Sequence, residues 1–282
     1  MQNYSDNSPV LRLLELGNPD EVTDWSIYRE LRITSEHFDE LSQMAIDIDL
    51  LDSEVETHWA GPIHAWRMLG ELGIPEAMVS DRPEVIGPLV QGLQKMGEEL
   101  LDWAGDEFST IFARIGPSGI PALTELIANT TASNYSRWNA ARCISAICEE
   151  HPQSRADGVA VLTQQLEKFA TNDPDLNAML LINLVIDLRA VESIAVIEKA
   201  FQAGRVNEDF MGGWDEVQVE LGLKDRSEVP EKLRRNMMFD SWEYVKPKAI
   251  GFSGHSGGKV PKTKAKAKRQ VQSSSRKKNR KK

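Results

Sequence analysis

The feature that most constrains the fold is a pattern that recurs along the chain: an apolar helix end, a tight break, and a new apolar helix. The four copies lie at residues 68–78, 112–123, 144–154 and 182–197. Spacings of 43, 32 and 41 residues separate them, measured at Leu72, Ile115, Ile147 and Leu188. Each period holds one antiparallel helix pair, and a single pair cannot bury its own apolar face. The pattern therefore predicts helix pairs that stack on one another.

Apolar residues recur at helical spacing, and neither sustained alternation nor an Asn-Gly hairpin turn is present. The expected fold class is all-α. Ser8 before Pro9, with Gly17 further on, predicts a first helix with a cap at each end. Ser35 is the expected cap of a helix at 35–46. Further helices are expected at 62–72, 82–101, 107–115, 120–128, 138–149, 155–169, 176–188, 191–203 and 215–221, the last capped by Asp215.

Charge divides the chain into an acidic body and a basic tail. The chain has 43 acidic and 33 basic residues, a net charge of -10. Twelve basic and no acidic residues lie in 259–282, which leaves 21 basic residues and a net charge of -22 before Lys259. From Gly251 onward the chain is too polar to form a core, which predicts disorder. The expected domains are an N-terminal helical cap (1–57), a repeat region (58–223), a C-terminal helical cap (224–250) and the tail (251–282).

Composition also bears on location. No apolar run approaches the roughly 20 residues that a membrane helix needs, so we expect no membrane span. The first ten residues lack the basic and apolar regions of a secretory signal. Cys143 and Cys148 are too few for a disulfide framework or a four-cysteine zinc site. They lie about 140° apart around a helix axis, as expected of small core residues rather than a bonded pair. A cytoplasmic location is expected.

The segments GIPAL at 119–123 and WNAARCISAI at 138–147 resemble the paired helices of HEAT-like repeats, including the short type named after phycobilisome lyases. The resemblance covers roughly residues 58–223, and the same stretch is similar to bacterial HEAT-repeat proteins. It implies an α-solenoid of stacked antiparallel helix pairs. Because the repeat pattern is degenerate, it specifies this architecture far better than it specifies an activity.

Unusual side chains gather around a predicted helix start at Gly61-Pro62, and they form our first candidate partner surface: His58, Trp59, His64, Trp66 and Arg67. A metal site there is disfavoured, because the two histidines are six residues apart across a proline and no H-x-x-x-H spacing occurs. Packing of the two tryptophans at a repeat junction is the structural interpretation. Contact with a partner protein is the functional one.

Trp138 and Arg142 extend the candidate surface, since a spacing of four places them on one helix face. HEAT-like DNA glycosylases for alkylated bases use Trp, Asp and Arg on a concave face. Here no Asp lies four residues from Trp138, and the acidic body repels phosphate. Stacking of Arg142 on Trp138, or pairing with Glu149 or Asp187, is expected instead.

Near the end of the repeat region, Gly212-Gly213 lacks the remainder of a phosphate-binding loop. We expect Trp214 to cover the terminal repeat. Neither a catalytic constellation nor a cofactor motif is present in the sequence, so we expect no catalytic residues, cofactor or metal.

The tail predicts binding to polyanions such as nucleic acid or ribosomes through counterion release, without reading of sequence. No aromatic residue is interleaved for base stacking. Masking of the acidic body is the alternative role. The cations of the tail are Lys259, Lys262, Lys264, Lys266, Lys268, Arg269, Arg276, Lys277, Lys278, Arg280, Lys281 and Lys282.

These observations favour a non-catalytic protein–protein interaction scaffold, in which an acidic solenoid binds an unidentified protein partner and the basic tail serves as an electrostatic tether. Two alternatives stay open. One is a phycobilisome-lyase-like accessory that acts on a chromophore or a client protein. The other is association with nucleic acid or ribosomes through the tail.

Overall fold

The computed structural model describes residues 4, 5, 7–73, 83–96 and 99–229. Within these ranges every regular element is helical and there is no strand, so the predicted all-α class is confirmed for this part of the chain. The basic tail and most of the expected C-terminal cap lie outside the described residues.

The α-helices are α1 (Ile27–Glu30), α2 (Phe38–Met44), α3 (Gly61–Gly73), α4 (Ile86–Met96), α5 (Leu101–Ile115), α6 (Ile120–Ala128), α7 (Asn134–Glu150), α8 (Arg155–Leu166), α9 (Pro174–Ile182), α10 (Ile194–Gln202), α11 (Glu208–Met211) and α12 (Trp214–Glu220). A π-helical turn, η9 (Asn183–Asp187), continues α9. The 3₁₀ segments are η1 (Pro9–Glu15), η2 (Pro19–Glu21), η3 (Ser35–His37), η4 (Ile48–Asp52), η5 (His58–Ala60), η6 (Pro83–Val85), η7 (Pro117–Gly119), η8 (Pro152–Ser154), η10 (Val191–Ser193) and η11 (Arg226–Glu228).

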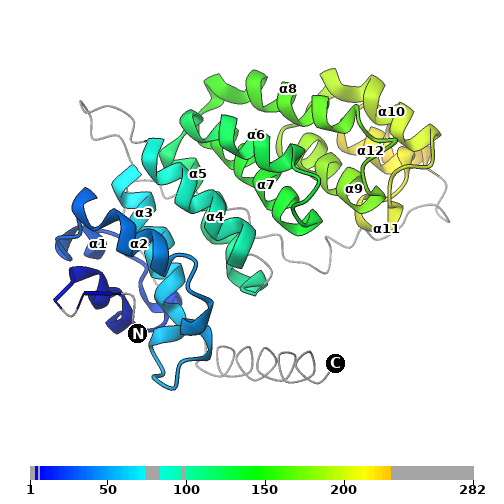
Figure 1. The fold of residues 1–282 in the computed structure, drawn as a ribbon. Helices are drawn as coiled ribbons and strands as arrows, with labels where there is room; N and C mark the ends of the chain where they lie inside the picture. The colour runs from blue at the N-terminus through cyan, green and yellow to red at the C-terminus, as the bar shows by residue number, and fades with distance from the viewer. Residues whose placement is uncertain (1–3, 6, 74–82, 97–98, 230–282) are drawn as a thin grey trace, which may run out of the picture. The chain divides into compact units, whose positions relative to one another are not determined.

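The longer helices lie in two rows, and successive helices alternate between them (Figure 1). In the core row, α3 packs on α5, α5 on α7, and α7 on α9. In the outer row, α4 packs on α6, α6 on α8, and α8 on α10. Helices of the core row are buried on most sides, whereas α8 exposes a broad face to solvent. This is the packing expected when amphipathic helix pairs share their apolar faces with neighbouring pairs.

Each described passage from the core row to the outer row runs through a 3₁₀ turn: η7 after α5, η8 after α7 and η10 after η9. Pro117 and Pro152 begin two of these turns, where a backbone N–H is not needed. Gly116 precedes the first with φ +88°, a conformation that other residues adopt only with strain. The recurring break predicted at 112–123, 144–154 and 182–197 is therefore confirmed. Part of the copy at 68–78 lies outside the described residues.

Close approach within the core row depends on small residues. Gly70 of α3 faces Ile111 of α5, and an added Cβ would lie 3.0 Å from the Ile111 Cγ2. Gly105 of α5 lies against the guanidinium of Arg142. A Cβ added at Gly105 would also lie 3.1 Å from the Asn139 Oδ1. Larger residues at these two positions would push α3, α5 and α7 apart.

Side chains also tie each helix pair to the next through backbone carbonyls. The His151 Nε2 donates to the Ala113 carbonyl at 2.8 Å, and the Arg155 Nη2 donates to the Leu188 carbonyl at 2.7 Å. Arg189 continues the series with a 2.5 Å bond to the carbonyl of Glu220. These bonds satisfy carbonyl groups at helix ends that the helices themselves leave without donors.

Several helix boundaries differ from prediction. The helix expected at 82–101 is shorter, because α4 ends at Met96 and α5 begins at Leu101; the leucine spacing runs across the boundary and hides it. In the helix expected at 35–46, the cap is Thr34 rather than Ser35. Thr34 and His37 form a capping box at the start of η3. The prediction that Asp215 caps the last helix, α12, was also wrong. Gly213 occupies that position, and its N–H donates to the Glu216 carboxylate at 3.1 Å.

Candidate interaction surfaces

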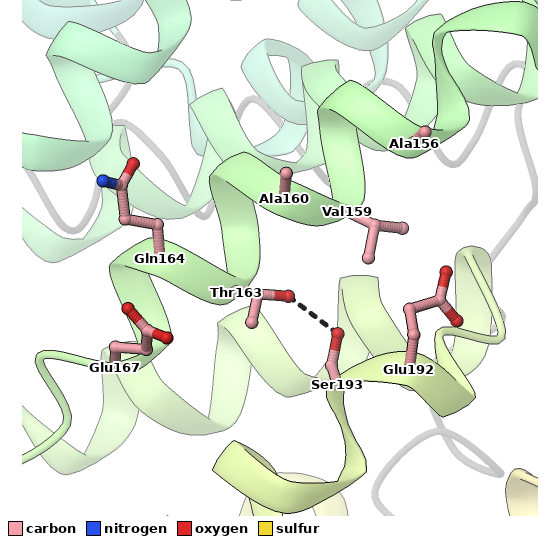
Figure 2. A pocket seen from close by; sticks show the side chains of 8 residues that line it. All are labelled: Ala156, Val159, Ala160, Thr163, Gln164, Glu167, Glu192 and Ser193. Atoms are coloured by element: carbon pink, nitrogen blue, oxygen red, sulfur yellow. Dashed lines mark hydrogen bonds between the residues drawn. The ribbon is translucent and has the colours of Figure 1, made fainter.

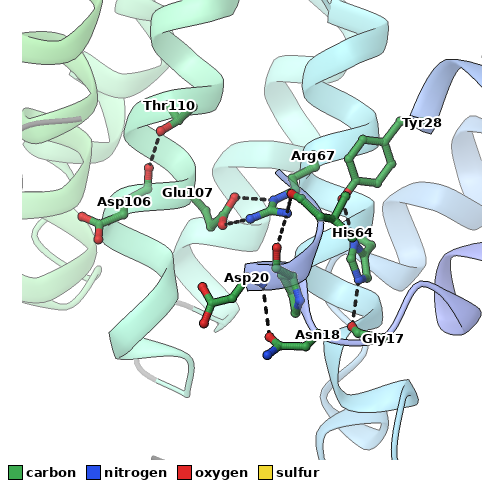
Figure 3. A network of polar contacts seen from close by, with 11 residues as sticks. Gly17, Asn18, Asp20, Tyr28, His64, Arg67, Asp106, Glu107 and Thr110 are labelled. Atoms are coloured by element: carbon green, nitrogen blue, oxygen red, sulfur yellow. Dashed lines mark hydrogen bonds and ion pairs between the residues drawn. The ribbon is translucent and has the colours of Figure 1, made fainter. Parts of the chain in front are cut away.

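A buried polar network fastens the N-terminal segment to α3 (Figure 3). The His64 Nε2 lies 3.0 Å from the Gly17 carbonyl, and the Nδ1 lies 2.7 Å from the Tyr28 hydroxyl. Because a carbonyl can only accept, Nε2 carries the proton and Nδ1 accepts from Tyr28. Burial lowers the pKa of His64 to about 4 and raises that of Tyr28 to about 12. Both groups are neutral and serve as fixed hydrogen-bonding partners.

Arg67 is the centre of the same region. Its guanidinium makes two hydrogen bonds to the Glu107 carboxylate, one of them from Nε at 2.8 Å. Its Nη1 donates to the carbonyls of Pro19 and Val22 at 2.9 and 3.1 Å. With 6% and 8% of their surface exposed, Arg67 and Glu107 form a buried ion pair that joins α3, α5 and the N-terminal segment.

Trp25 lies between two cations, with its ring centroid 5.1 Å from the Arg67 guanidinium and 4.8 Å from that of Arg114. Arg114 pairs with Glu71, which also accepts from the Arg29 Nε at 2.9 Å. Stacking of this kind stabilises a desolvated guanidinium. Glu71 is thereby neutralised inside the protein, while the Arg29 side chain keeps 65% of its surface exposed.

Burial changes the interpretation of the first candidate surface. His64 and Trp66 expose none of their surface, and Arg67 exposes 6%. The prediction that these three residues belong to a partner surface is therefore not supported by their burial. Trp66 stacks on Phe108 at 4.5 Å and donates from Nε1 to the Ala45 carbonyl at 2.7 Å. Packing of Trp66 thus agrees with the structural interpretation of this cluster, but the sequence did not show that the segments covering α3 come from the N-terminal region.

The other residues of that cluster are half-buried. The His58 Nδ1 lies 3.2 Å from the Ser53 hydroxyl. The ring of Trp59 packs 5.9 Å from that of Trp103 on α5. Packing of Trp59 at a junction between helix pairs thus agrees with the structural interpretation, and contact with a partner stays a prediction for these two residues.

Trp138 and Arg142 lie together on α7, as their spacing predicts. The guanidinium lies 5.4 Å from the Trp138 ring centroid, which confirms the expected stacking. Arg142 also pairs with Asp106 on α5 at 3.1 Å, an interaction that no local spacing could indicate. Both side chains are half-buried. Their contacts hold α5 and α7 together, and a role in binding a partner stays a prediction.

The remaining sequence candidates are structural in this fold. The ring of Trp214 packs 5.8 Å from Phe201 and so contacts α10, in agreement with its expected position over the last helix pair. Cys143 and Cys148 are buried with free thiols. Burial raises the pKa of Cys143 to about 12 and that of Cys148 to about 11, which keeps both thiols protonated and unreactive.

A groove in the outer row was not predicted from the sequence (Figure 2). It is a hollow of about 350 Å³ between α8 and η10 that is largely open to solvent. Across its floor the Thr163 and Ser193 hydroxyls are hydrogen-bonded at 2.7 Å. The lining residues are Ala156, Val159, Ala160, Thr163, Gln164, Glu167, Glu192 and Ser193. A signal was present in the sequence, since Ala156 and Ala160 lie four apart on a helix face that also carries polar residues.

The described cations are largely used within the body. Eleven of them form a hydrogen bond or an ion pair with another residue: Arg29, Arg67, Arg114, Arg137, Arg142, Arg155, Lys168, Arg189, Arg205, Lys224 and Arg226. Exposed carboxylates, in contrast, are numerous along residues 15–56, where Arg29 and Arg32 are the only cations. The surface of the body is therefore strongly acidic.

Two further properties concern the described part of the chain. None of its helices is long and apolar enough to cross a membrane. Among the same residues, no group of three or more His, Cys, Asp or Glu side chains comes together in a way that could hold a metal ion.

Over the residues that the structure describes, the fold and sites define an all-helical protein with buried ion pairs between its helices and an acidic surface. The family model described as "Protein of unknown function (DUF1186)" matches residues 88–245, which is more than half of the chain. The protein therefore belongs to the DUF1186 family. No curated protein and no solved structure matches the chain.

Proposed function

We propose that the protein is a non-catalytic interaction scaffold whose acidic body binds a protein partner. The observation that carries this proposal is the distribution of charge. Buried and half-buried arginines join one helix to another, as Arg67 and Arg155 do, and the carboxylate surplus faces solvent. A surface of this kind attracts basic partners and repels nucleic acid and other polyanions.

The two helix rows support a HEAT-like solenoid as the architecture of this scaffold. Each described pair packs on the next, and side-chain bonds such as that from His151 to the Ala113 carbonyl repeat along the array. Stacked helix pairs present extended surfaces, which repeat proteins use to bind other polypeptides. The proposal places binding on this surface rather than in an enclosed pocket.

The basic tail acts, in this proposal, as an electrostatic tether at residues 259–282. Its twelve positive charges carry a sign opposite to that of the body, so the two parts select different molecules. The body provides recognition and the tail adds affinity for a polyanion near the partner. Neutralising several phosphates releases their counterions, and the tail's contribution weakens steeply between about 50 and 200 mM salt.

The test is a pull-down from the native cell with the full chain and with a variant ending at residue 250. We expect one protein partner to bind both, and polyanions to bind only the full chain at low salt. A variant with Lys259–Lys282 cations replaced by Gln is the matched control, because it keeps the length of the tail.

Three outcomes would contradict the proposal. Loss of every protein partner in the tail variants would make the tail the recognition element and favour association with nucleic acid or ribosomes. A visible absorbance band after co-expression with bilin synthesis would favour the lyase-like alternative. Turnover of a client by the purified protein would exclude a non-catalytic role.

A further inference from the structure

We propose that residues 9–44 form a strap that leaves α3 by local unfolding in mild acid, with His64 as the group that senses pH. These residues are called the N-terminal strap below. The inference goes beyond the proposed scaffold function, since it concerns how the first helix of the core row is covered and uncovered. It is carried by the hydrogen bonds between the strap and α3 (Figure 3).

Three polar side chains of α3 face the strap. His64, Arg67 and Glu71 lie three and four residues apart, which places them on one face of the helix. All three are buried, and each bonds to a different part of the strap. The bonds join His64 to Gly17 and Tyr28, Arg67 to Pro19 and Val22, and Glu71 to Arg29. Polar contacts of this kind are typical of interfaces that open and close.

The strap has little regular structure of its own. Its longest elements, η1 and α2, have seven residues each, and α1 has four. Isolated helices need about 12–15 residues to be even marginally stable in water. The strap is therefore folded only while it lies on α3, and its departure is a local unfolding event.

Contacts with α5 keep α3 in place when the strap leaves. Arg67 pairs with Glu107 and Glu71 pairs with Arg114, and both of these partners belong to α5. α3 also packs directly on α5. Release of the strap therefore leaves neither Arg67 nor Glu71 without an ionic partner.

His64 couples this event to pH. Both ring nitrogens are bonded to the strap, Nε2 to the Gly17 carbonyl and Nδ1 to the Tyr28 hydroxyl, and the ring is fully buried. A proton on Nδ1 removes the acceptor for the Tyr28 hydroxyl and places a second buried positive charge near Arg67. Once the strap has left, water solvates the charged ring.

The direction of the effect follows from these two states. Burial under the strap, together with the charge of Arg67, lowers the pKa of His64 to about 4, and exposure returns it to an ordinary 6.5. The uncovered state therefore binds more protons between these two pH values. Stability of the strap on α3 is complete above pH 6.5 and is lost progressively as the pH falls toward 4.

Within the described structure, Tyr28 is the titratable group bonded to His64. Burial raises the pKa of Tyr28 to about 12, so its hydroxyl stays protonated. Other charged or titratable groups on the elements packed against α3 have partners of their own: Arg29, Glu40, His58, Glu71, Glu107 and Arg114. The remaining ones are exposed: Arg12, Glu15, Glu30, Asp39, Glu84, Lys95 and Asp106. His64 is thus the buried group whose hydrogen-bonding partners both belong to the strap.

Amide hydrogen exchange of the full-length protein at pH 7 and pH 5 tests the proposal. Protection factors, corrected for the intrinsic pH dependence of exchange, are compared between the strap and α7. We expect the hydrogen-bonded amides of Tyr28 and Leu31 to be at least about tenfold less protected than those of α7 at both pH values. From pH 7 to pH 5, the two pKa values predict a fall of about twentyfold in protection of the strap.

His64→Gln identifies the sensor, because a glutamine amide can donate to Gly17 and accept from Tyr28 but does not titrate. We expect the fall in protection to disappear in this variant. His151→Gln is the matched control, since His151 is a half-buried histidine that donates to the Ala113 carbonyl on α5, and the fall should remain there. Circular dichroism checks that each variant is folded.

Tyr28→Phe is a second variant for the case that His64→Gln does not fold. It removes the donor to Nδ1 but keeps the aromatic ring, so the neutral form of His64 loses one of its two partners. The pKa of His64 then moves back toward 6.5, and the fall in protection becomes smaller than in the unmodified protein.

Three results would overturn the inference. Equal protection of the strap and α7 would mean that the strap leaves only when the whole protein unfolds. Constant protection of the strap between pH 7 and pH 5 would exclude control by pH, and an unchanged fall in His64→Gln would assign that control to another group. None of these results concerns partner binding, so the proposed scaffold function would stand in each case.

Discussion

The buried Arg67–Glu107 pair permits a quantitative prediction about stability. In Arg67→Met, the Glu107 carboxylate keeps 8% of its surface exposed but loses a partner that made two hydrogen bonds. The carbonyls of Pro19 and Val22 lose a donor as well. Breaking a buried ion pair from one side costs about 3–5 kcal/mol. Because the free energy of unfolding of a typical domain is about 5–15 kcal/mol, this single change removes a large part of the stability.

The double variant Arg67→Met/Glu107→Leu provides the decisive comparison. It removes both charges, so no carboxylate remains buried without a partner. The remaining loss is that of the two carbonyl bonds, at about 1 kcal/mol each, and of the stacking on Trp25, which Arg67→Met loses as well. We therefore expect the double variant to be more stable than Arg67→Met by at least about 1 kcal/mol, even though it carries one more substitution.

Urea unfolding followed by tryptophan fluorescence and circular dichroism measures these differences. Arg226→Met is the matched control, because Arg226 is about half exposed and lies 3.6 Å from Glu220. An exposed pair of this kind contributes at most about 1 kcal/mol. The reasoning is refuted if the free energy of unfolding of Arg67→Met lies within about 1 kcal/mol of that of the unmodified protein. It is also refuted if the double variant is less stable than Arg67→Met.

Three other results are expected. The pKa of His64 falls from an ordinary 6.5 to about 4 on folding, so the unfolded chain binds more protons, and stability drops by about 2 kcal/mol between pH 7 and pH 5. Urea titrations should show that His64→Gln lacks this part of the drop. An equal drop in both proteins would contradict the prediction. Cys143→Ser should leave partner binding unchanged in a pull-down, since the thiol is buried and protonated; loss of binding without loss of stability would show that the thiol takes part in binding the partner. Thiol reagents should modify Cys143 and Cys148 at least about 100-fold more slowly in the native protein than in urea, and equal rates would show that burial does not protect them.

Local signals explain which parts of the fold could be predicted. The bounds of α6, Ile120–Ala128, were predicted to the residue, because glycine and proline mark its start and polar residues follow its end. The start of α7 at Asn134 was missed by four residues, since its cap, Ser133, belongs to a run of polar residues that reads equally well as a loop. Periodicity thus identifies helices, and caps alone fix where they begin.

The candidate sites were harder to predict because their contacts are distant in sequence. Glu107 lies 40 residues from Arg67, and no spacing rule connects them. Burial of Trp66 agrees with its structural interpretation, whereas burial of His64 depends on the N-terminal segment that lies over α3. The groove depends on how α8 and η10 lie beside each other, which their separate sequences do not state.

The covering of α3 by the N-terminal region also has a consequence for contacts between copies of the protein. η1, α1 and α2 all pack on α3, and Arg67 holds the segment around Pro19 in place. In a row of similar helices, an uncovered first helix would offer the kind of apolar face that α5 offers to α7. Such head-to-tail contacts do not close on themselves, and they generate filaments rather than defined oligomers. Residues 9–44 therefore keep the apolar face of α3 away from other copies of the chain, and we expect their removal to favour association of the protein.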